Sequence, residues 1–266
     1  GLRPAMVSRG YKGGWERSGG VLSDGKSILG SWQESGDEAY MVALNIPQAG
    51  VFVGKNRLRS CQKAKDHGFE IAVLDDGFQH RRLSRDVDIV LYDPKDRSLL
   101  REPVSSLKRA DALLLEEGIL RHQIEKMKKD SPRTAIFEYS VESKAFFRLE
   151  RNEKESAEVF QGKKILAFCG IARPERFLVL LQKEAIHPVD FLVFPDHYSY
   201  PLRSLEKISK RGQKLQAEAL LTTEKDAVKI SHTQALQHIP VYYLKIDLKL
   251  EEKFYTMMSS LLQNRV

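Results

Sequence analysis

The sequence predicts an α/β protein: a doubly wound parallel sheet followed by a smaller α/β unit. Apolar runs without alternation, such as residues 71–74 and 87–92, are typical of strands covered on both faces. Segments with helical spacing separate these runs, as in βαβ units. A charged stretch at 117–133 interrupts this alternation, which begins again at 163. We therefore expect two units in one chain.

In the first half, strands are expected at 4–7, 51–53, 71–74, 87–92 and 112–115. A helix should begin at Asp37 and Glu38, because acids after a glycine favour the positive end of a helix dipole. A basic helix is predicted to follow at 55–67, and a shorter helix at 104–109 begins after Pro103. Strands 71–74 and 87–92 should be buried.

The second half begins with two extended segments, 134–141 and 145–149, which a polar turn at 142–144 should separate. Beyond 163 we expect strands and helices in alternation, ending with a strand at 241–246 and a helix at 251–262. The predicted domains are a core at 1–137, linker strands at 138–162 and a smaller α/β domain at 163–266.

Composition limits the possible functions. The 43 Lys and Arg residues exceed the 36 Asp and Glu residues, giving a formal charge of +7 that suits anionic partners. The two cysteines have no metal-ligand spacing, so a reducing compartment is the default and a structural zinc is not indicated. The cations lack interleaved aromatic residues, so nucleic acid is not an expected partner.

Asp75 and Asp76 directly follow the strand at 71–74. Ligands of open α/β sheets gather at the carboxyl ends of such strands. Adjacent carboxylates repel each other, so they need a divalent cation, a basic group or a retained proton. A magnesium-nucleotide site is the first hypothesis, and a surface turn that merely ends the strand is the alternative.

Other candidate residues are ambiguous by themselves. Asp37 is either a helix cap or a general base, and residues 8–14 form either a ligand-facing loop or a flexible connection. On residue type alone, His197 is best interpreted as a hydrogen-bonded loop histidine, whereas His80 lies close to the acid pair.

Taken together and in order, the motifs resemble the tetraacyldisaccharide 4′-kinase family, the lipid A 4′-kinases of Gram-negative bacteria. The resemblance covers nearly the whole chain, and several motifs in the right order are far more specific than any one. The motifs are Ser8-Arg9-Gly10-Tyr11, Gly36-Asp37-Glu38, Leu74-Asp75-Asp76-Gly77-Phe78-Gln79-His80, Arg101-Glu102-Pro103, Phe168-Cys169-Gly170-Ile171-Ala172, Asp196-His197-Tyr198 and Thr222-Thr223-Glu224-Lys225-Asp226.

The resemblance implies a P-loop nucleotide-hydrolase core and a smaller α/β domain, joined by a two-stranded linker with the active site between them. It implies transfer of phosphate from ATP, with Mg²⁺, to the 4′-hydroxyl of a tetraacyl disaccharide 1-phosphate. The partners would be this lipid A precursor and the inner-membrane surface, to whose cytoplasmic face the protein would bind peripherally.

The same resemblance assigns roles to residues of this chain. Asp37 matches the proposed catalytic base and His197 its partner. Asp75 and Asp76 match the acidic pair near magnesium, together with Glu102. The remaining assignments are Gln79, His80 and Arg101 on the nucleotide side, and Tyr11, Arg9 and Gly10 near the disaccharide.

The chain also departs from the family pattern. No Gly-x-x-x-x-Gly-Lys-Ser/Thr phosphate loop occurs in the 266 residues, and no amino-terminal apolar segment precedes the first strand. Residues 93–100 are shorter than the family's loop before Arg-Glu-Pro, which leaves the geometry around Arg101 open. Because domains rarely begin inside their sheet, we expect further residues before Gly1, and we favour a truncated kinase over a degenerate paralogue.

Two other functions fit the residues. Adjacent aspartates near a histidine could serve a metal-dependent phosphohydrolase, which would release phosphate from a phosphorylated sugar lipid without ATP. A non-catalytic basic module for anionic lipid or nucleotide is the second alternative.

We predict that the polypeptide of residues 1–266, expressed alone, has little or no kinase activity, because it lacks the loop that cradles ATP phosphates. The measurement is ATP-dependent phosphorylation of the tetraacyl disaccharide 1-phosphate. Robust turnover by this polypeptide would contradict the prediction.

Overall fold

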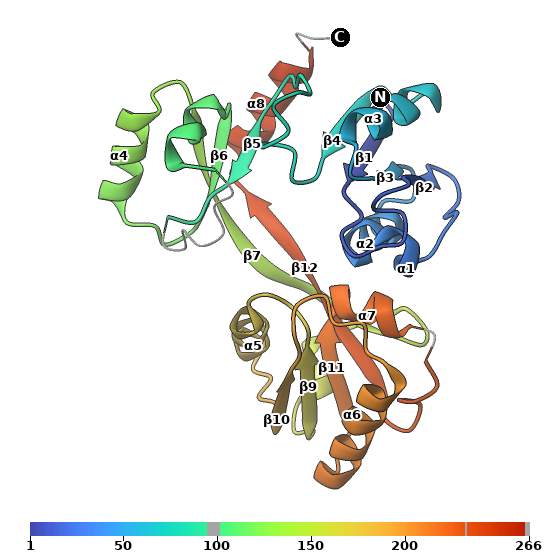
Figure 1. Ribbon diagram of the computed structural model, residues 1–266. Helices are drawn as coiled ribbons and strands as arrows, with labels where there is room; N and C mark the ends of the chain where they lie inside the picture. The colour runs from blue at the N-terminus through green and yellow to red at the C-terminus, as the bar shows by residue number, and fades with distance from the viewer. Residues whose placement is uncertain (95–101, 232, 264–266) are drawn as a thin grey trace. The chain divides into compact units, whose positions relative to one another are not determined.

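The computed structural model describes residues 1–94, 102–231 and 233–263, which form two compact units. The first unit comprises residues 1–75 and 143–246, and the second comprises residues 76–142 and 247–266. Two long strands, β7 and β12, each contribute residues to both units (Figure 1). The domain boundaries predicted at 137/138 and 162/163 stay a prediction.

The first unit holds two sheets. The elements of its amino-terminal part are β1 (Pro4–Ser8), β2 (Gly20–Asp24), α1 (Trp32–Ser35), α2 (Asp37–Asn45), β3 (Gly50–Val53), α3 (Arg57–Asp66) and β4 (Ile71–Leu74). Those of its second part are β8 (Glu153–Glu155), η3 (Ala157–Phe160), β9 (Ile165–Cys169), α5 (Pro174–Lys183), β10 (Asp190–Val193), α6 (Leu202–Leu215), β11 (Ala219–Thr223), α7 (Glu224–Ile230) and β12 (Val241–Leu250).

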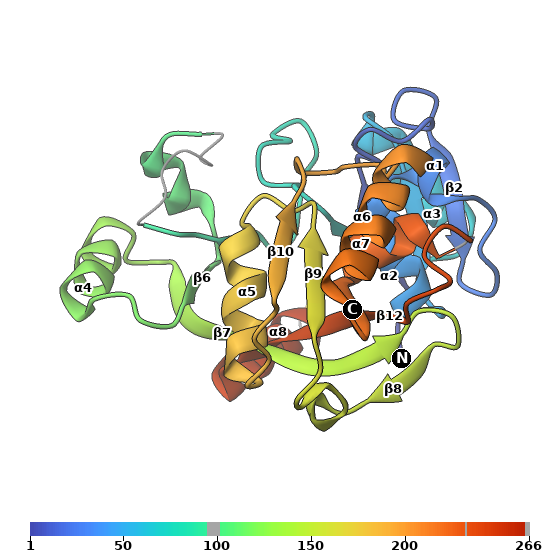
Figure 2. The ribbon, with the colours of Figure 1, turned by 90° about the horizontal axis from the view of Figure 1, so that it is seen from below.

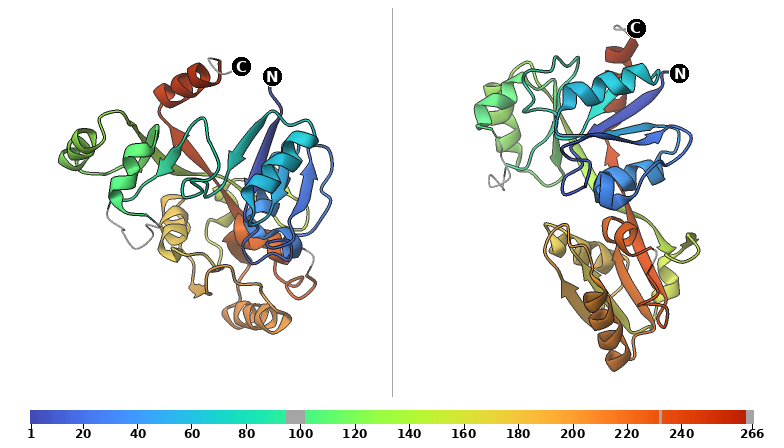
Figure 3. Two further views of the ribbon diagram at one scale, coloured as in Figure 1. Left: turned by 45° about the horizontal axis from the view of Figure 1, so that its top comes forward. Right: turned by 45° about the vertical axis from the view of Figure 1, so that its right-hand side comes forward.

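The amino-terminal sheet has the strand order β2-β3-β1-β4, with β1, β3 and β4 parallel and β2 antiparallel. Helix α3 packs its Ala64 against Val7 and Phe52. Helix α2 packs Ala39 and Ala43 against the alternate β3 residues, Val51 and Val53. Since successive strand residues point to opposite faces, α2 and α3 cover opposite faces of this sheet (Figure 3).

The second sheet of the first unit joins β10, β9, β11 and β12 as parallel neighbours (Figure 2). Helix α6 packs Ile208 on Leu166 of β9. The α5 residue Phe177 contacts Phe191, which lies in register with Ala167 and so points to the other face. The confirmed alternation of strands and helices thus yields a doubly covered sheet here as well.

The second unit is built on a parallel sheet of β5 (Ile89–Leu91), β6 (Ala112–Glu116) and the first part of β7 (Ala135–Arg148). Its helical elements are η2 (Val104–Arg109), α4 (Arg121–Asp130) and α8 (Glu252–Gln263). Helix α8 buries Phe254 against Phe137 at a ring separation of 5.5 Å. Leu113 and Leu115 point to the opposite face and pack with Leu107 of η2.

Three expectations from the sequence are wrong. The predicted turn at 142–144 does not exist, because β7 runs unbroken from Ala135 to Arg148. The strands predicted to be buried are edge strands instead: Val73 of β4 is 59% exposed and Leu91 of β5 is 58% exposed. An apolar run shows that a strand forms, but it does not show whether that strand lies at the centre or the edge of its sheet.

Among the described residues, no helix is both long and apolar enough to cross a bilayer.

The glycine-rich loop after β1 is bonded to the segment that leads into α2. Gly14 and Trp15 donate backbone hydrogen bonds to the carbonyls of Gln33 (2.9 Å) and Glu34 (2.8 Å). A Cβ on Gly13 would lie 2.5 Å from the Glu34 carbonyl oxygen and 2.6 Å from the Gly36 nitrogen. The close approach of two backbones therefore requires glycine at position 13.

We predict that Gly13→Ala lowers the free energy of unfolding by about 1–3 kcal/mol, because neither backbone can move without breaking these bonds. Urea denaturation followed by circular dichroism measures this. Gly14→Ala is the matched control, since a Cβ there meets its nearest atoms at 3.8 Å. Equal stability of the two variants would contradict the predicted clash.

Candidate active site

Asp37 is the first residue of α2 and is 5% exposed. It follows Gly36, whose φ of +85° is in the region that favours glycine. The turn at Gly36 starts the helix directly at the acid, so the carboxylate lies at the positive end of the helix dipole. The sequence prediction of a helix beginning at Asp37 is confirmed.

His197 lies between β10 and α6, and its ring reaches Asp37. Its Nδ1 is 3.1 Å from each carboxylate oxygen of Asp37. The residue has φ of +57°, and its backbone N–H donates to the Gly170 carbonyl at 3.2 Å. Tyr11 meets the imidazole edge-on, with ring centroids 5.1 Å apart. Residues from three distant segments therefore form one cluster in the first unit, around the buried Asp37.

Two lysines of α7 supply positive charge to this cluster. Lys225 Nζ is 3.0 Å from Glu38 Oε1 and 3.4 Å from Asp196 Oδ1. Lys229 Nζ is 3.5 Å from Asp37 Oδ2 and 2.8 Å from Asp226 Oδ1. Four carboxylates thus face two ammonium groups here.

These contacts set the ionisation of Asp37. Burial opposes the charged form most strongly, but the hydrogen bond from His197 and the charge of Lys225 outweigh it and lower the pKa of Asp37. Burial likewise opposes the charge on Lys225, yet Glu38 and Asp37 raise the pKa of that lysine. At neutral pH the cluster holds an ionised Asp37 and a charged Lys225.

Donor atoms of Asp37, Glu38 and His197 all lie within 4.8 Å of one another. That spacing could suit a metal ion. However, the ammonium of Lys225 already contacts the Glu38 carboxylate, and Lys229 lies beside Asp37. We therefore interpret the cluster as an ion-pair network whose cations are lysines.

Asp75 ends the first unit, just after β4. Its backbone N–H donates to the Val7 carbonyl (3.0 Å), and its Oδ2 accepts from Ser8 Oγ at 3.0 Å. Buried Arg57 donates to the carbonyls of Gly54 (2.7 Å) and Asp75 (3.1 Å). The carboxyl ends of β1, β3 and β4 are thereby tied together, which fixes where Asp75 lies.

The other predicted nucleotide-side residues belong to the second unit. Asp76 has φ of +52°, and the following turn includes Gln79 and a bond from His80 N–H to the Gly77 carbonyl at 2.9 Å. Glu102 forms an ion pair with Arg109, whose guanidinium lies 4.5 Å from the centre of the Phe78 ring. Arg101 lies outside the described residues.

The residues expected near the disaccharide, Arg9, Gly10 and Tyr11, lie in one loop, and Tyr11 contacts His197. Arg9 lies 5.7 Å from the Tyr11 ring centre and forms a 2.7 Å ion pair with Glu16. A Cβ on Gly10 would come within 2.9 Å of the Ser35 carbonyl. This tight packing brings Tyr11 to His197.

Sequence reasoning assigned no role to Glu38, Asp196, Lys225 or Lys229, although all four belong to the cluster. Three of them lie within motifs that the sequence does display. Lys229 could have been found from its spacing, because it follows Asp226 by three residues on a predicted helix.

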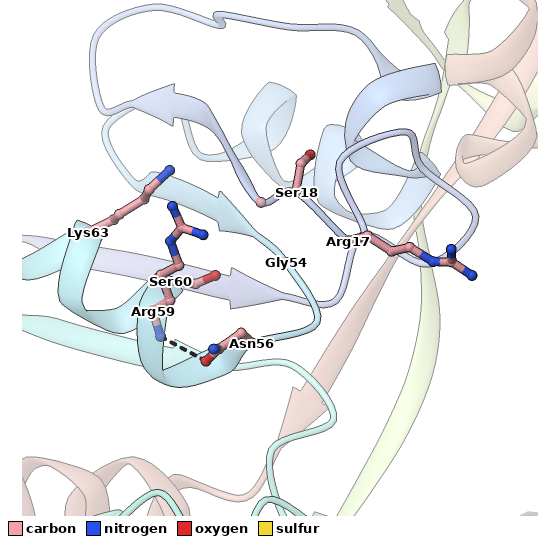
Figure 4. Close-up of a pocket in the computed structure, with 8 residues that line it drawn as sticks. Arg17, Ser18, Gly54, Asn56, Arg59, Ser60 and Lys63 are labelled. Carbon is pink, nitrogen blue, oxygen red and sulfur yellow. Dashed lines mark hydrogen bonds between the residues drawn. The ribbon is translucent and has the colours of Figure 1, made fainter.

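A small pocket of about 140 Å³ lies beside the start of α3 (Figure 4). It is lined by Arg17, Ser18, Gly19, Gly54, Asn56, Arg59, Ser60 and Lys63. Asn56 already uses its side chain to cap the helix, accepting from the Arg59 N–H at 3.1 Å. The Arg17 side chain points away from Arg59 and Lys63, so the cations do not converge on one point.

Comparisons with known proteins find relatives with the name tetraacyldisaccharide 4′-kinase. The tetraacyldisaccharide 4′-kinase of Desulfotalea psychrophila is 38% identical over 250 residues, covering 86% of this chain and 70% of that protein. The enzyme of the same name from Syntrophus aciditrophicus is 34% identical over 276 residues, covering 94% and 73%. The sequence-level resemblance is thus confirmed.

The fold is similar to that of the "apo" form of LpxK from Aquifex aeolicus in complex with ATP. The TM-score is 0.73 at 28% identity, over 98% of this chain and 78% of that one, which confirms the predicted P-loop NTPase-like α/β class. The family model for tetraacyldisaccharide-1-P 4′-kinase matches residues 1–263. The chain therefore belongs to the tetraacyldisaccharide-1-phosphate 4′-kinase family.

Proposed function

We propose that this protein transfers the γ-phosphoryl group of ATP to the 4′-hydroxyl of a tetraacyl disaccharide 1-phosphate, with Asp37 as the base. The observation that carries the proposal is the buried contact between Asp37 and His197, at 3.1 Å to both carboxylate oxygens. Membership of a kinase family supplies the reaction class.

A sugar hydroxyl is a weak nucleophile until its proton has a destination. In the proposed step the 4′-hydroxyl proton passes to Asp37, the hydroxyl oxygen bonds to the γ-phosphorus, and the bond to ADP breaks. In this proposal Nδ1–H of His197 donates a hydrogen bond to the carboxylate and so orients it. Because cations surround Asp37, the carboxylate is ionised and ready to accept a proton at neutral pH.

Tyr11 and Arg9 are proposed to contact the disaccharide, because their loop carries Tyr11 to His197 and therefore to the hydroxyl that reacts. Gly10 permits that loop to pack closely.

We propose that ATP is contacted by Gln79, His80, Arg101 and Glu102.

Mg²⁺ is proposed to be held by Asp75, Asp76 and Glu102. The donor chemistry fits, because Mg²⁺ prefers carboxylate oxygens, and Asp75 is held at the carboxyl end of a parallel strand beside the Ser8 hydroxyl. When bound, the ion would neutralise charge on the phosphates. Ser8 and Arg57 position Asp75 for that role.

We also propose peripheral binding at the cytoplasmic face of the bacterial inner membrane. The acceptor is a lipid, so the protein must meet a membrane surface to reach it. A formal charge of +7 favours contact with anionic head groups. The lipid A precursor and this surface are the proposed partners.

The test is incubation of the product of the complete gene with ATP and the disaccharide 1-phosphate. Phosphorylated disaccharide and ADP should form in equal amounts, and only when both substrates are present. Release of inorganic phosphate from a phosphorylated sugar lipid without ATP would instead support the phosphohydrolase, which family membership does not favour.

We predict that Asp37→Asn in the product of the complete gene lowers kcat by about 10²–10⁴-fold, the usual contribution of a general base. The KM for ATP should change little, because Asp37 acts on the acceptor. Steady-state kinetics measure both quantities, with Asp66→Asn, an exposed acid of α3, as the control. Wild-type turnover in the Asp37 variant would remove the base assignment.

We predict that Asp75→Asn raises the Mg²⁺ concentration needed for half-maximal activity at least tenfold, in the roughly 10–100-fold range expected when a metal site is perturbed. Binding of Mn²⁺, followed by electron paramagnetic resonance, provides a readout that is independent of turnover. Glu117→Gln, an exposed acid of the second unit, should behave as wild type. An unchanged metal requirement in Asp75→Asn would argue against the site.

A further inference from the structure

Lys229 is the most deeply buried cation of the Asp37 cluster, with a side chain only 1% exposed. Its Nζ lies 2.8 Å from Asp226 Oδ1, 3.5 Å from Asp37 Oδ2 and 5.3 Å from the centre of the Tyr200 ring. The contact with Asp226 is short but is not aligned as a hydrogen bond, so charge attraction sustains it. This lysine is thus held between two carboxylates.

Asp226 is itself held rigidly. Its Oδ2 accepts from the Gly170 N–H at 2.8 Å and from Thr223 Oγ1 at 2.7 Å, and its side chain is fully buried. The two donors occupy one carboxylate oxygen, while the other faces Lys229. The three-residue spacing on α7 brings the carboxylate and the ammonium together.

Helix α7 packs against α2, the helix that Asp37 begins. The two helices are also joined by Asn45 Nδ2, which donates to Glu224 Oε1 at 2.8 Å. Lys229 therefore reaches Asp37 from a helix that packs against α2 and is bonded to it at its first turn. Such a lysine can place a charge beside Asp37 with little freedom to move.

Burying an ammonium carries a desolvation penalty of several kcal/mol even when it is paired. An apolar residue would join α7 to α2 without that penalty. The position of the charge beside Asp37, rather than packing alone, accounts for a lysine at this site.

We propose that Lys229, anchored by Asp226, is a positioning residue of the kinase: it holds the Asp37 carboxylate against His197 and adds a positive charge, beside those of its neighbours, that favours the anion. The inference rests on the proposed function, in which Asp37 is the base. It also gives the Thr222–Asp226 motif a role, because Asp226 of that motif holds Lys229 in place.

Other charged and titratable groups contact Asp37 or its direct neighbours. They are Tyr11 from the loop after β1, Glu38 from α2 itself, Asp196 and His197 from the segment after β10, Tyr200 before α6, and Lys225 and Asp226 from α7. Because these groups stay in place when Lys229 alone is changed, the effect of its charge can be isolated.

The test compares Lys229→Met, which keeps the length but removes the charge, with Lys229→Arg, which keeps the charge. The acid limb of the kcat/KM profile should move to higher pH by roughly one unit or less in Lys229→Met, since one of several groups that favour the Asp37 anion is lost. The value of kcat should fall by roughly tenfold or more, as expected when a general base is mispositioned. In Lys229→Arg the acid limb and kcat should both return most of the way to the wild-type values. Lys210→Met, at an exposed position of α6, should change neither the acid limb nor kcat.

Asp226→Asn tests the pair from its other side. It removes a negative charge near Asp37, so the pKa of Asp37 should move down, opposite to its movement in Lys229→Met. A purely structural pair predicts similar losses in both variants and no opposed shifts. The opposed signs therefore separate charge placement from scaffolding.

A direct readout is the ¹³Cγ resonance of Asp37 as a function of pH, assigned by its absence from Asp37→Asn. It needs a folded protein but no turnover, so a failure of the proposed kinase activity would be seen separately. An unchanged Asp37 titration in folded Lys229→Met, or equal upward shifts in Lys229→Met and Asp226→Asn, would overturn the proposal. Should Lys229→Met fail to fold, Asp226→Asn and Lys229→Arg decide by the same titration.

Discussion

The contact between Asp37 and His197 is the interaction on which the rest of the site depends, because a carboxylate so deeply buried cannot stay ionised without compensation. The compensation comes from segments far apart in the chain. The loop that carries His197 and the helix that carries Lys225 and Lys229 both belong to the second half of the sequence, whereas Asp37 belongs to the first. Segments from both sheets of the first unit thus surround the charge of Asp37.

Each structural detail near Asp37 serves this placement. Gly36 starts α2 at Asp37, and Gly13 lets the loop that carries Tyr11 pack on the segment that precedes α2. Asp226 holds Lys229 and is itself bonded to Gly170, just after β9. The lowered pKa of Asp37 makes the carboxylate a weaker base, but it favours the unprotonated form that the proposed base needs. The barrier to phosphoryl transfer depends mainly on positioning and charge. In the proposed reaction a fully ionised carboxylate therefore matters more than a strongly basic one.

The sequence predicted the alternation of strands and helices, the start of α2 and the pairing of Asp37 with His197, because these depend on local patterns or on ordered motifs. It failed where the outcome depends on neighbours distant in the chain. Val73 and Leu91 look buried by composition but belong to edge strands, and the polar residues 142–144 continue β7 instead of forming a turn. Lys229 was missed because its spacing indicates only the pairing with Asp226 on its own helix, and nothing local points to Asp37, which begins a different helix.

Asp75 and Asp76 are kept close together by their shared peptide bond, whereas the groups around Asp37 are brought together by packing. The chain passes from the first unit to the second between Asp75 and Asp76, so the two carboxylates belong to different units yet share one peptide bond. Consecutive Cα atoms are about 3.8 Å apart whatever surrounds them. Ser8 and Arg57 fix Asp75 from one side, and the left-handed backbone of Asp76 turns the chain away immediately afterwards. The two carboxylates proposed to bind Mg²⁺ are therefore kept adjacent by the chain itself, whereas Asp37 is held in place by an ion-pair network.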